Sequence, residues 1–172
     1  MDKILENIKT RRSVRRYRPD AVPQEFLDKI AEAGLFAASG RGRQGTLILQ
    51  ITDKALRDRL SAMNAAIMGC DGDPFYGAPA LFVVLSNREY STYVYDGSLV
   101  MGNMMLEAHA LGLGSCWIHR AKEELESPLG QKILAKAGLE GEWEGVGHLA
   151  LGYADMPLPE PHPYNAARYI TI

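Results

Sequence analysis

The sequence lacks several features that mark particular classes of protein. It has two cysteines and four histidines among 172 residues, and no pair stands at the spacing of a zinc site. No apolar run approaches the roughly 20 residues that span a bilayer, and the N-terminus shows no signal-peptide core. We therefore expect no metal, no disulfide and no membrane association. Both thiols should be free in a reducing, cytoplasmic compartment.

An excess of charge of one sign is also missing. The net charge is -2, apolar residues make up 47% and charged residues 23%. A nucleic-acid partner is not expected, because phosphate backbones require a broad basic face. The composition is that of an ordinary globular protein. The length suits a single domain, residues 1–172, with a real hydrophobic core.

Hydrophobic periodicity predicts alternating helices and strands, with no repeat and no linker. Strands are expected over 46–52, 80–86, 113–118 and 146–153. Helices are expected over 2–10, from Pro23 to about Gly34, and over 53–68, 96–111 and 121–137, where Pro128 could break the last one. The segment 80–86 is apolar without alternation, so helices should cover both of its faces. This order predicts an α+β layered sandwich.

The C-terminal region is a proline-rich tail. Four prolines between residues 157 and 163 precede the segment RYITI, residues 168–172, whose alternation predicts a short strand. The tail carries no core of its own. A lone strand at its end is best explained if it pairs with another sheet, and a partner subunit could supply that sheet.

The first candidate site is the basic segment RRSVRRY, residues 11–17, which follows the first helix. Arginine presents a planar fork that binds phosphate bidentately, and the Ser13 hydroxyl can donate a further hydrogen bond. The ordinary interpretation is a solvated basic turn, because runs of charge usually lie on the surface. The segment alone favours that interpretation.

Two glycine-containing segments are the other candidates. ASGRGRQG, residues 38–45, permits close backbone approach to a flat ligand, and a flexible surface loop is its ordinary interpretation. LGLGSCWIH, residues 111–119, could present backbone donors and an apolar floor to a ring, or simply connect a helix to a strand. His119 could contact a substrate or donate a proton, although a surface histidine is more common. Cys116 in a strand is more often a small buried apolar side chain than a nucleophile.

Taken together and in this order, these segments resemble the nitroreductase family of FMN enzymes. The resemblance covers nearly the whole chain. It rests on RRSVRRY, ASGRGRQ, DPFYGAPALFVV, NMMLEAHALGLGSCWI, and GHLALGYAD followed by the proline-rich tail. It implies a three-layer α-β-α sandwich with a mixed, mainly antiparallel sheet. It also implies a homodimer that exchanges its C-terminal strands and binds two FMN molecules at the interface.

The resemblance also assigns residues to the cofactor site. Phosphate and flavin contacts fall on Arg11, Arg12, Ser13 and Arg15, with Arg15 also a candidate for stabilising negative charge on the ring. The loop that reaches the partner's flavin falls on Ala38, Ser39, Gly40 and Gln44. The wall beside the reactive edge falls on Cys116, Trp117, Ile118 and His119, and Asn64 matches a residue near the pyrimidine edge.

Two departures from the family pattern bear on the site. The second motif often reads PSxxNxQPW, whereas this chain has Ala38, Gly42 and Gly45-Thr46 at the differing positions. That wall should be thinner or more open. The tail has Glu160 and His162 where the family often has a lysine and an arginine. His162 could substitute weakly as a phosphate partner, while Glu160 would repel, so FMN could depend on the N-terminal arginines alone.

The function expected from the resemblance is transfer of electrons from NAD(P)H to nitroaromatic, quinone or related small acceptors by a ping-pong mechanism. An enzyme with a dedicated physiological substrate is one alternative. Another is a flavin-binding or redox-sensing protein with little turnover. A third is an interaction module with a decayed site. NADH oxidation with a quinone or nitro acceptor, and uptake of added FMN, distinguish them.

Overall fold

The computed structural model describes residues 2–172, and within them four strands form one sheet. The strand order is β1-β2-β4-β3, and all three pairings are antiparallel. A mixed sheet was expected, and the parallel pairing in the described residues is an isolated bridge between Ser13 and Ser115. The strands are β1 (Thr46–Ile51), β2 (Ala80–Asn87), β3 (Gly114–Ile118) and β4 (Trp143–Gly152).

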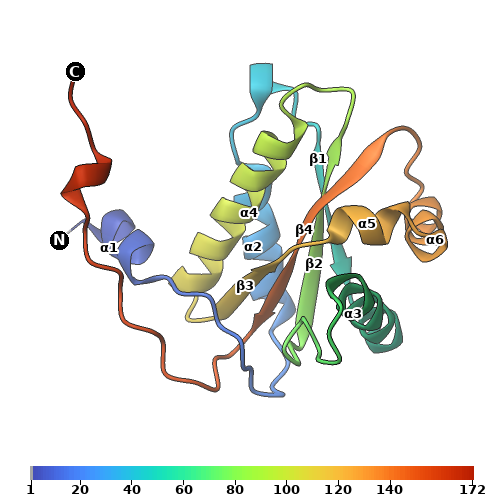
Figure 1. Cartoon of the computed structure of the whole chain (residues 1–172), viewed down its shortest axis with the longest axis horizontal. Helices are drawn as coiled ribbons and strands as arrows, with labels where there is room; N and C mark the ends of the chain where they lie inside the picture. Colours follow the sequence, from blue (N-terminus) through green and yellow to red (C-terminus); the bar gives the residue numbers. More distant parts are fainter. Residues whose placement is uncertain (1) are drawn as a thin grey trace.

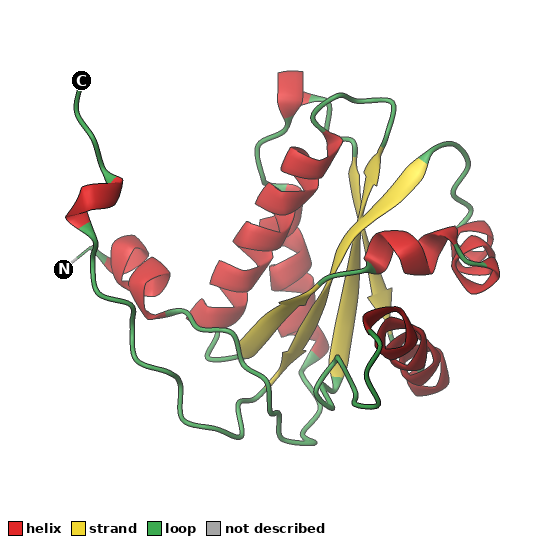
Figure 2. Ribbon diagram, viewed as in Figure 1, coloured by secondary structure: helices red, strands yellow, loops and turns green. Residues whose placement is uncertain are grey.

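Helices cover both faces of the sheet, as Figure 2 shows. One face is covered by α2 (Gln24–Leu35) and α4 (Tyr93–Ala110). The other is covered by α3 (Lys54–Met68), α5 (Ala121–Glu126) and α6 (Pro128–Lys136). Along β2, Phe82 and Val84 pack under the first pair of helices, while Val83 and Leu85 pack under the second set. The α+β sandwich and the double burial of this strand are thus confirmed.

The first helix, α1 (Lys3–Thr10), lies outside these layers, beside the C-terminal end of α4 (Figure 1). Its N-cap is Asp2, whose side chain accepts from two backbone N–H groups. Asn7 holds it to α4 by donating to the Leu106 carbonyl at 2.9 Å. None of its residues is buried, and its apolar stripe of Ile4, Leu5 and Ile8 is exposed.

Two element boundaries differ from the expected ones. α4 begins at Tyr93 rather than at residue 96, and β4 begins at Trp143 rather than at residue 146. The added residues include a polar side chain in β4. Glu144, for example, pairs with Ser86 in the ladder while its buried carboxylate meets Lys122. Backbone pairing does not require an apolar side chain. Pro128 does end one helix and start the next.

The strand expected over residues 168–172 is wrong for the single chain. These residues form no strand, and a short 3-10 turn, η2 (Ala166–Arg168), precedes their extended end. Residues 157–172 are all exposed. A strand exists only where another strand accepts its hydrogen bonds, and the tail passes beside α1 rather than beside the sheet (Figure 1). No helix of the described residues has the length and apolarity needed to cross a membrane.

Candidate functional site

The arginine-rich segment after α1 runs extended along the start of β3. The side chain of Val14 is fully buried, and its backbone N–H donates to the Ser115 carbonyl at 3.0 Å. Gly114 permits this approach, because a Cβ there would lie 2.6 Å from the Val14 side chain. Farther along, the Tyr17 hydroxyl lies 2.8 Å from the Val14 carbonyl oxygen and 3.2 Å from that of Ala150. The segment is therefore fixed by buried Val14 and Tyr17. Arg15 and Arg16 lie between these two residues, and Arg11 and Arg12 precede them.

Three of these arginines lack an acidic partner. Arg11, Arg12 and Arg15 form no salt bridge with any residue from 2 to 172. The Nη1 atom of Arg11 is buried and has no hydrogen-bond partner in the described chain. Burial and the neighbouring Arg12 lower the pKa of Arg11. Burial, followed by Arg11 and Arg12, also lowers the pKa of His109. Desolvated cations that repel one another form a site that favours an anion.

Cys116 lies among the same arginines. Burial raises the pKa of its thiol. The positive charge of Arg15, a hydrogen bond with Ser13 and the charge of Arg11 partly offset this rise. The side chain packs with the apolar cluster between the sheet and α3. The thiol is therefore a buried neutral group rather than an activated nucleophile, which agrees with its expected role.

The first part of the tail runs beside the arginine segment. The Arg18 N–H donates to the Tyr153 carbonyl and the Asp155 N–H donates to the Arg16 carbonyl, each at 2.9 Å. Farther along, the Nε of Arg12 donates to the carbonyl of Glu160 at 3.2 Å. The backbone of Glu160, not its carboxylate, thus meets the cluster. His162 is exposed and makes no hydrogen bond or salt bridge within residues 2–172, so its proposed phosphate contact stays a prediction.

The expected wall at residues 116–119 is divided by the pleat of β3. Cys116 and Ile118 are buried on the α3 side, whereas Trp117 is half-buried and packs with the cluster under α4. Gly147 makes room for the indole, because a Cβ there would lie 2.2 Å from its Nε1. His119 is exposed just beyond the strand. Arg120 then adopts a left-handed conformation with φ of 78° at the start of α5.

The loop of Ala38, Ser39, Gly40 and Gln44 lies at the other end of the molecule, where it includes the 3-10 turn η1 (Gly40–Gly42). Buried Asp96 on α4 accepts the Gly40 N–H at 2.9 Å and the Thr92 hydroxyl at 2.9 Å. A Cβ on Gly40 would lie 2.3 Å from the Thr92 hydroxyl oxygen. Arg41 and Gln44 have φ of 56° and 53°, conformations that cost a non-glycine residue roughly 1–3 kcal/mol.

One chain does not bring the two halves of the expected site together. The arginine segment adjoins the C-terminal end of α4, where Thr10 meets His109 at 2.8 Å. The loop adjoins the N-terminal end of the same helix through Asp96. At about 1.5 Å per residue, an 18-residue helix is about 27 Å long. The two parts of one chain are therefore separated by roughly the length of α4.

Asn64 is fully buried next to the end of β3. Its amide donates to the His119 carbonyl and to Glu124, and accepts from Arg120. These bonds engage the amide inside the protein, so a contact between Asn64 and the flavin stays a prediction. Asp96 is the residue that sequence reasoning missed. An acidic residue in the first turn of an apolar helix was the available signal, but its partners are distant in the sequence.

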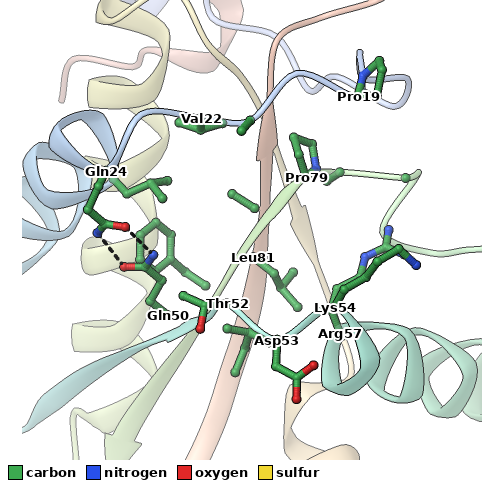
Figure 3. Close-up of a pocket in the computed structure, with 17 residues that line it drawn as sticks. Pro19, Val22, Gln24, Gln50, Thr52, Asp53, Lys54, Arg57, Pro79 and Leu81 are labelled. Carbon is green, nitrogen blue, oxygen red and sulfur yellow. Dashed lines mark hydrogen bonds between the residues drawn. The ribbon is translucent and has the colours of Figure 1, made fainter.

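A further cleft lies away from these residues. It has a volume of about 520 Å³ and lies where β1 ends and β2 begins, between the N-terminal ends of α2 and α3. Figure 3 shows the paired amides of Gln24 and Gln50 on one side of it, with Lys54 and Arg57 on the other. None of the expected site residues lines this cleft.

Comparison with known proteins decides the family. The model described as "Nitroreductase family" matches residues 8–153. The chain belongs to the nitroreductase family. The nitroreductase with bound FMN from Bacteroides fragilis has a TM-score of 0.88 and 26% identity over 100% of both chains.

Two archaeal relatives carry the provisional name NADH dehydrogenase/NAD(P)H nitroreductase. The one from Archaeoglobus fulgidus is 32% identical over 123 residues, which are 69% of this chain and 68% of the relative. The one from Methanothermobacter thermautotrophicus is 29% identical over 118 residues, 66% of this chain. The match spans only 59% of that relative's length.

Proposed function

We propose that this nitroreductase-family protein is a flavoprotein oxidoreductase that binds FMN and oxidises NADH or NADPH. The observation that carries the proposal is the cluster of unpaired arginines, in which the buried Nη1 of Arg11 has no partner within residues 2–172. A buried donor without an acceptor costs about 1–3 kcal/mol. A bound phosphate supplies that acceptor, and nitroreductases related to this chain in structure hold FMN.

The residues present fit such a cofactor. Arg11 offers a planar fork and Ser13 a hydroxyl to the phosphate. Arg12 adds its charge and its Nη2, because its Nε and Nη1 donate to the carbonyls of Glu160 and Arg11. Each charge-assisted bond contributes roughly 1.5–3 kcal/mol. Arg15 is exposed and unpaired in the same segment, and we assign it to the negative charge that develops at the pyrimidine edge of the ring. The end of β3, with Trp117 and His119, lines the reactive edge.

When bound, FMN supplies the hydride and electron chemistry. The protein positions the two reacting rings and excludes bulk water. NAD(P)H and an acceptor, such as a nitroaromatic or a quinone, occupy the same face in turn, which gives ping-pong kinetics. No side-chain nucleophile is required, which suits the buried, neutral thiol of Cys116.

We also propose that the functional unit is a homodimer. The separation of the arginine segment from the loop at 38–44 is one argument. The other is apolar surface: Phe36, Tyr95, Leu99 and the α1 stripe are exposed, and so are Tyr164, Tyr169, Ile170 and Ile172 of the tail. β1 has a neighbour on one side only, so its free edge can accept the terminal segment of a second copy. Free thiols at Cys70 and Cys116 suit a cytoplasmic location.

The first experiment is a visible spectrum of the purified protein, recorded with added FMN and then with NADH or NADPH without oxygen. Flavin bands that bleach with either nucleotide support the reductase, and an acceptor screen follows. Bands that persist with both nucleotides favour the flavin-binding or redox-sensing alternative. Absence of any FMN binding contradicts the proposal.

A second experiment tests the dimer. Light scattering should give twice the chain mass for the full protein. Removal of residues 169–172 should shift the protein toward monomer, because the terminal segment can no longer pair with β1 of the partner. A full-length monomer at micromolar concentration with FMN bound would contradict the two-chain site.

A further inference from the structure

A series of buried polar side chains connects the end of β3 to the centre of the sheet. Asn64 on α3 donates from its Nδ2 to the His119 carbonyl at 2.9 Å and also to the Glu124 carboxylate. Its Oδ1 accepts from the Nε of Arg120 at 2.9 Å. The second oxygen of Glu124 lies 2.9 Å from the Nε2 of His148 on β4. The amide of Asn64 thus lies between a guanidinium and a carboxylate.

Burial of these polar side chains costs desolvation free energy, which a purely structural role does not explain. The side chains of Glu124 and His148 are 0% and 1% exposed, and the Nδ1 of His148 has no partner within residues 2–172. The ring of Phe75 also lies near the imidazole, at 5.0 Å between centroids. Apolar residues of similar volume often replace such a buried pair with no loss of stability. The burial of this pair therefore points to a role other than stabilising the fold.

The turn that the cluster holds is strained. Arg120 has φ of 78°, which costs an L-residue roughly 1–3 kcal/mol and persists only where the surroundings impose it. Here Asn64 binds both the preceding carbonyl and the Arg120 side chain. The Arg120 carbonyl in turn accepts the Glu124 N–H at 3.1 Å. These bonds form a closed ring around the turn.

The peptide group between His119 and Arg120 presents a backbone donor. The two polar atoms of a trans peptide point in opposite directions. Because the His119 carbonyl points to Asn64, the N–H of Arg120 points to the side opposite Asn64. That N–H donates to no described residue. The cluster therefore presents a fixed backbone donor at the end of β3.

We propose that Glu124 and His148, acting through Asn64, are positioning residues that fix the His119–Arg120 turn against the edge of the bound cofactor ring. This inference rests on the proposed function, which places the end of β3 beside the ring. It adds a reason why this chain keeps a buried carboxylate, amide and imidazole in contact. Loss of the pair releases the turn without removing any group that touches the cofactor.

The test uses the double variant Glu124→Leu/His148→Leu, which replaces the pair with apolar side chains. Glu124→Gln is the conservative variant, since an amide still accepts from Asn64 and can donate to a neutral His148. Glu144→Gln is the matched control, because Glu144 is also buried on β4 but pairs with Arg88 and Lys122. The readouts are FMN affinity, the visible circular dichroism of bound FMN, and amide hydrogen exchange at residues 119–121 in the FMN-free protein.

The double variant should fold, exchange faster at residues 119–121, bind FMN about tenfold more weakly and change the dichroism of the flavin. Glu124→Gln and Glu144→Gln should match the wild type. Wild-type exchange, affinity and dichroism in the folded double variant would overturn the inference. If the double variant does not fold, Asn64→Leu is measured with the same readouts.

The hydrogen-exchange arm separates this inference from the proposed function. A wild-type protein that binds no FMN contradicts the function, while exchange at residues 119–121 still shows whether the pair holds the turn. Conversely, FMN binding that is unaffected in a folded double variant leaves the function standing and removes the positioning role.

Discussion

The arginines of this protein differ in whether they pair with carboxylates, as Arg57 and Arg11 show. Arg57 on α3 lies 2.8 Å from Asp58 and 2.6 Å from Asp73, and these hydrogen-bonded carboxylates raise its pKa although burial alone would lower it. Arg11 pairs with no carboxylate within residues 2–172, and burial with repulsion from Arg12 lowers its pKa. The paired arginine stabilises the fold. The arginines without a carboxylate partner carry positive charge that, in the proposed function, a bound phosphate neutralises.

The largest expected effect is on FMN binding. Arg11→Ala/Arg12→Ala should weaken FMN binding by at least about 100-fold, because two charge-assisted contacts at roughly 1.5–3 kcal/mol each are lost. Titration of the FMN-free protein by flavin fluorescence measures this. Arg16→Ala/Arg18→Ala is the matched control, since these exposed arginines pair with Asp155 and Asp20. Equal affinities for the two double variants would remove the distinction between the groups.

Arg57→Ala should act on stability instead. It leaves Asp73, whose side chain is 34% exposed, without its cation, so the free energy of unfolding should fall by roughly 1 kcal/mol. Urea denaturation measures the change, and FMN affinity should stay at the wild-type value. Lys54→Ala, which removes an exposed partner of Asp58, should leave the midpoint unchanged. A large loss of FMN affinity in folded Arg57→Ala would contradict a purely structural role.

The paired group should also make stability sensitive to acid. Burial would raise the pKa of Asp73, but hydrogen bonds from Ser61, the N–H groups of Gly77 and Phe75, and Arg57 outweigh it and lower that pKa. A depressed carboxyl pKa gives stability that is fully present above the unfolded value of about 3.9 and is lost as the pH falls through the folded value. Urea midpoints between pH 6 and roughly pH 3 should therefore fall at the acid end. The fall should be shallower in Asp73→Asn and unchanged in the exposed variant Asp71→Asn.

The smallest expected effect is a change in the titration of His109. Burial, Arg11 and Arg12 lower its pKa in the FMN-free chain. An anion bound by these arginines cancels part of their field, so the pKa of His109 should rise when FMN is added. NMR titration of the imidazole detects this rise. A pKa that FMN leaves unchanged would place the phosphate away from the N-terminal arginines.

Much of the fold was predictable because it depends on local patterns. The apolar run at 80–86 indicated a strand covered on both faces, and Pro128 indicated the break between α5 and α6; both are confirmed. The strand predicted over residues 168–172 is absent from the single chain for a physical reason. Its alternation shows that it can pair, but a strand also needs a neighbour, and the single chain provides none there.

The candidate site was predictable in its residue types and not in its geometry. The arginines of residues 11–15 stood out by composition, yet only the structure shows that they lack carboxylate partners. Asn64 shows the same limit. Its flavin contact, which the resemblance implies, stays a prediction, and only the structure shows that its amide binds the His119–Arg120 turn.

The sequence by itself determined the periodic elements and the family, because these depend on the order of side chains along the chain. The tertiary structure alone decided which arginines are paired, which half of the site lies at which end of α4, and how the His119–Arg120 turn is held. Those properties depend on contacts between residues far apart in the sequence, such as Gly40 with Asp96 and Asn64 with Glu124. Burial then sets the strength of each contact, because charges and hydrogen bonds act more strongly away from water.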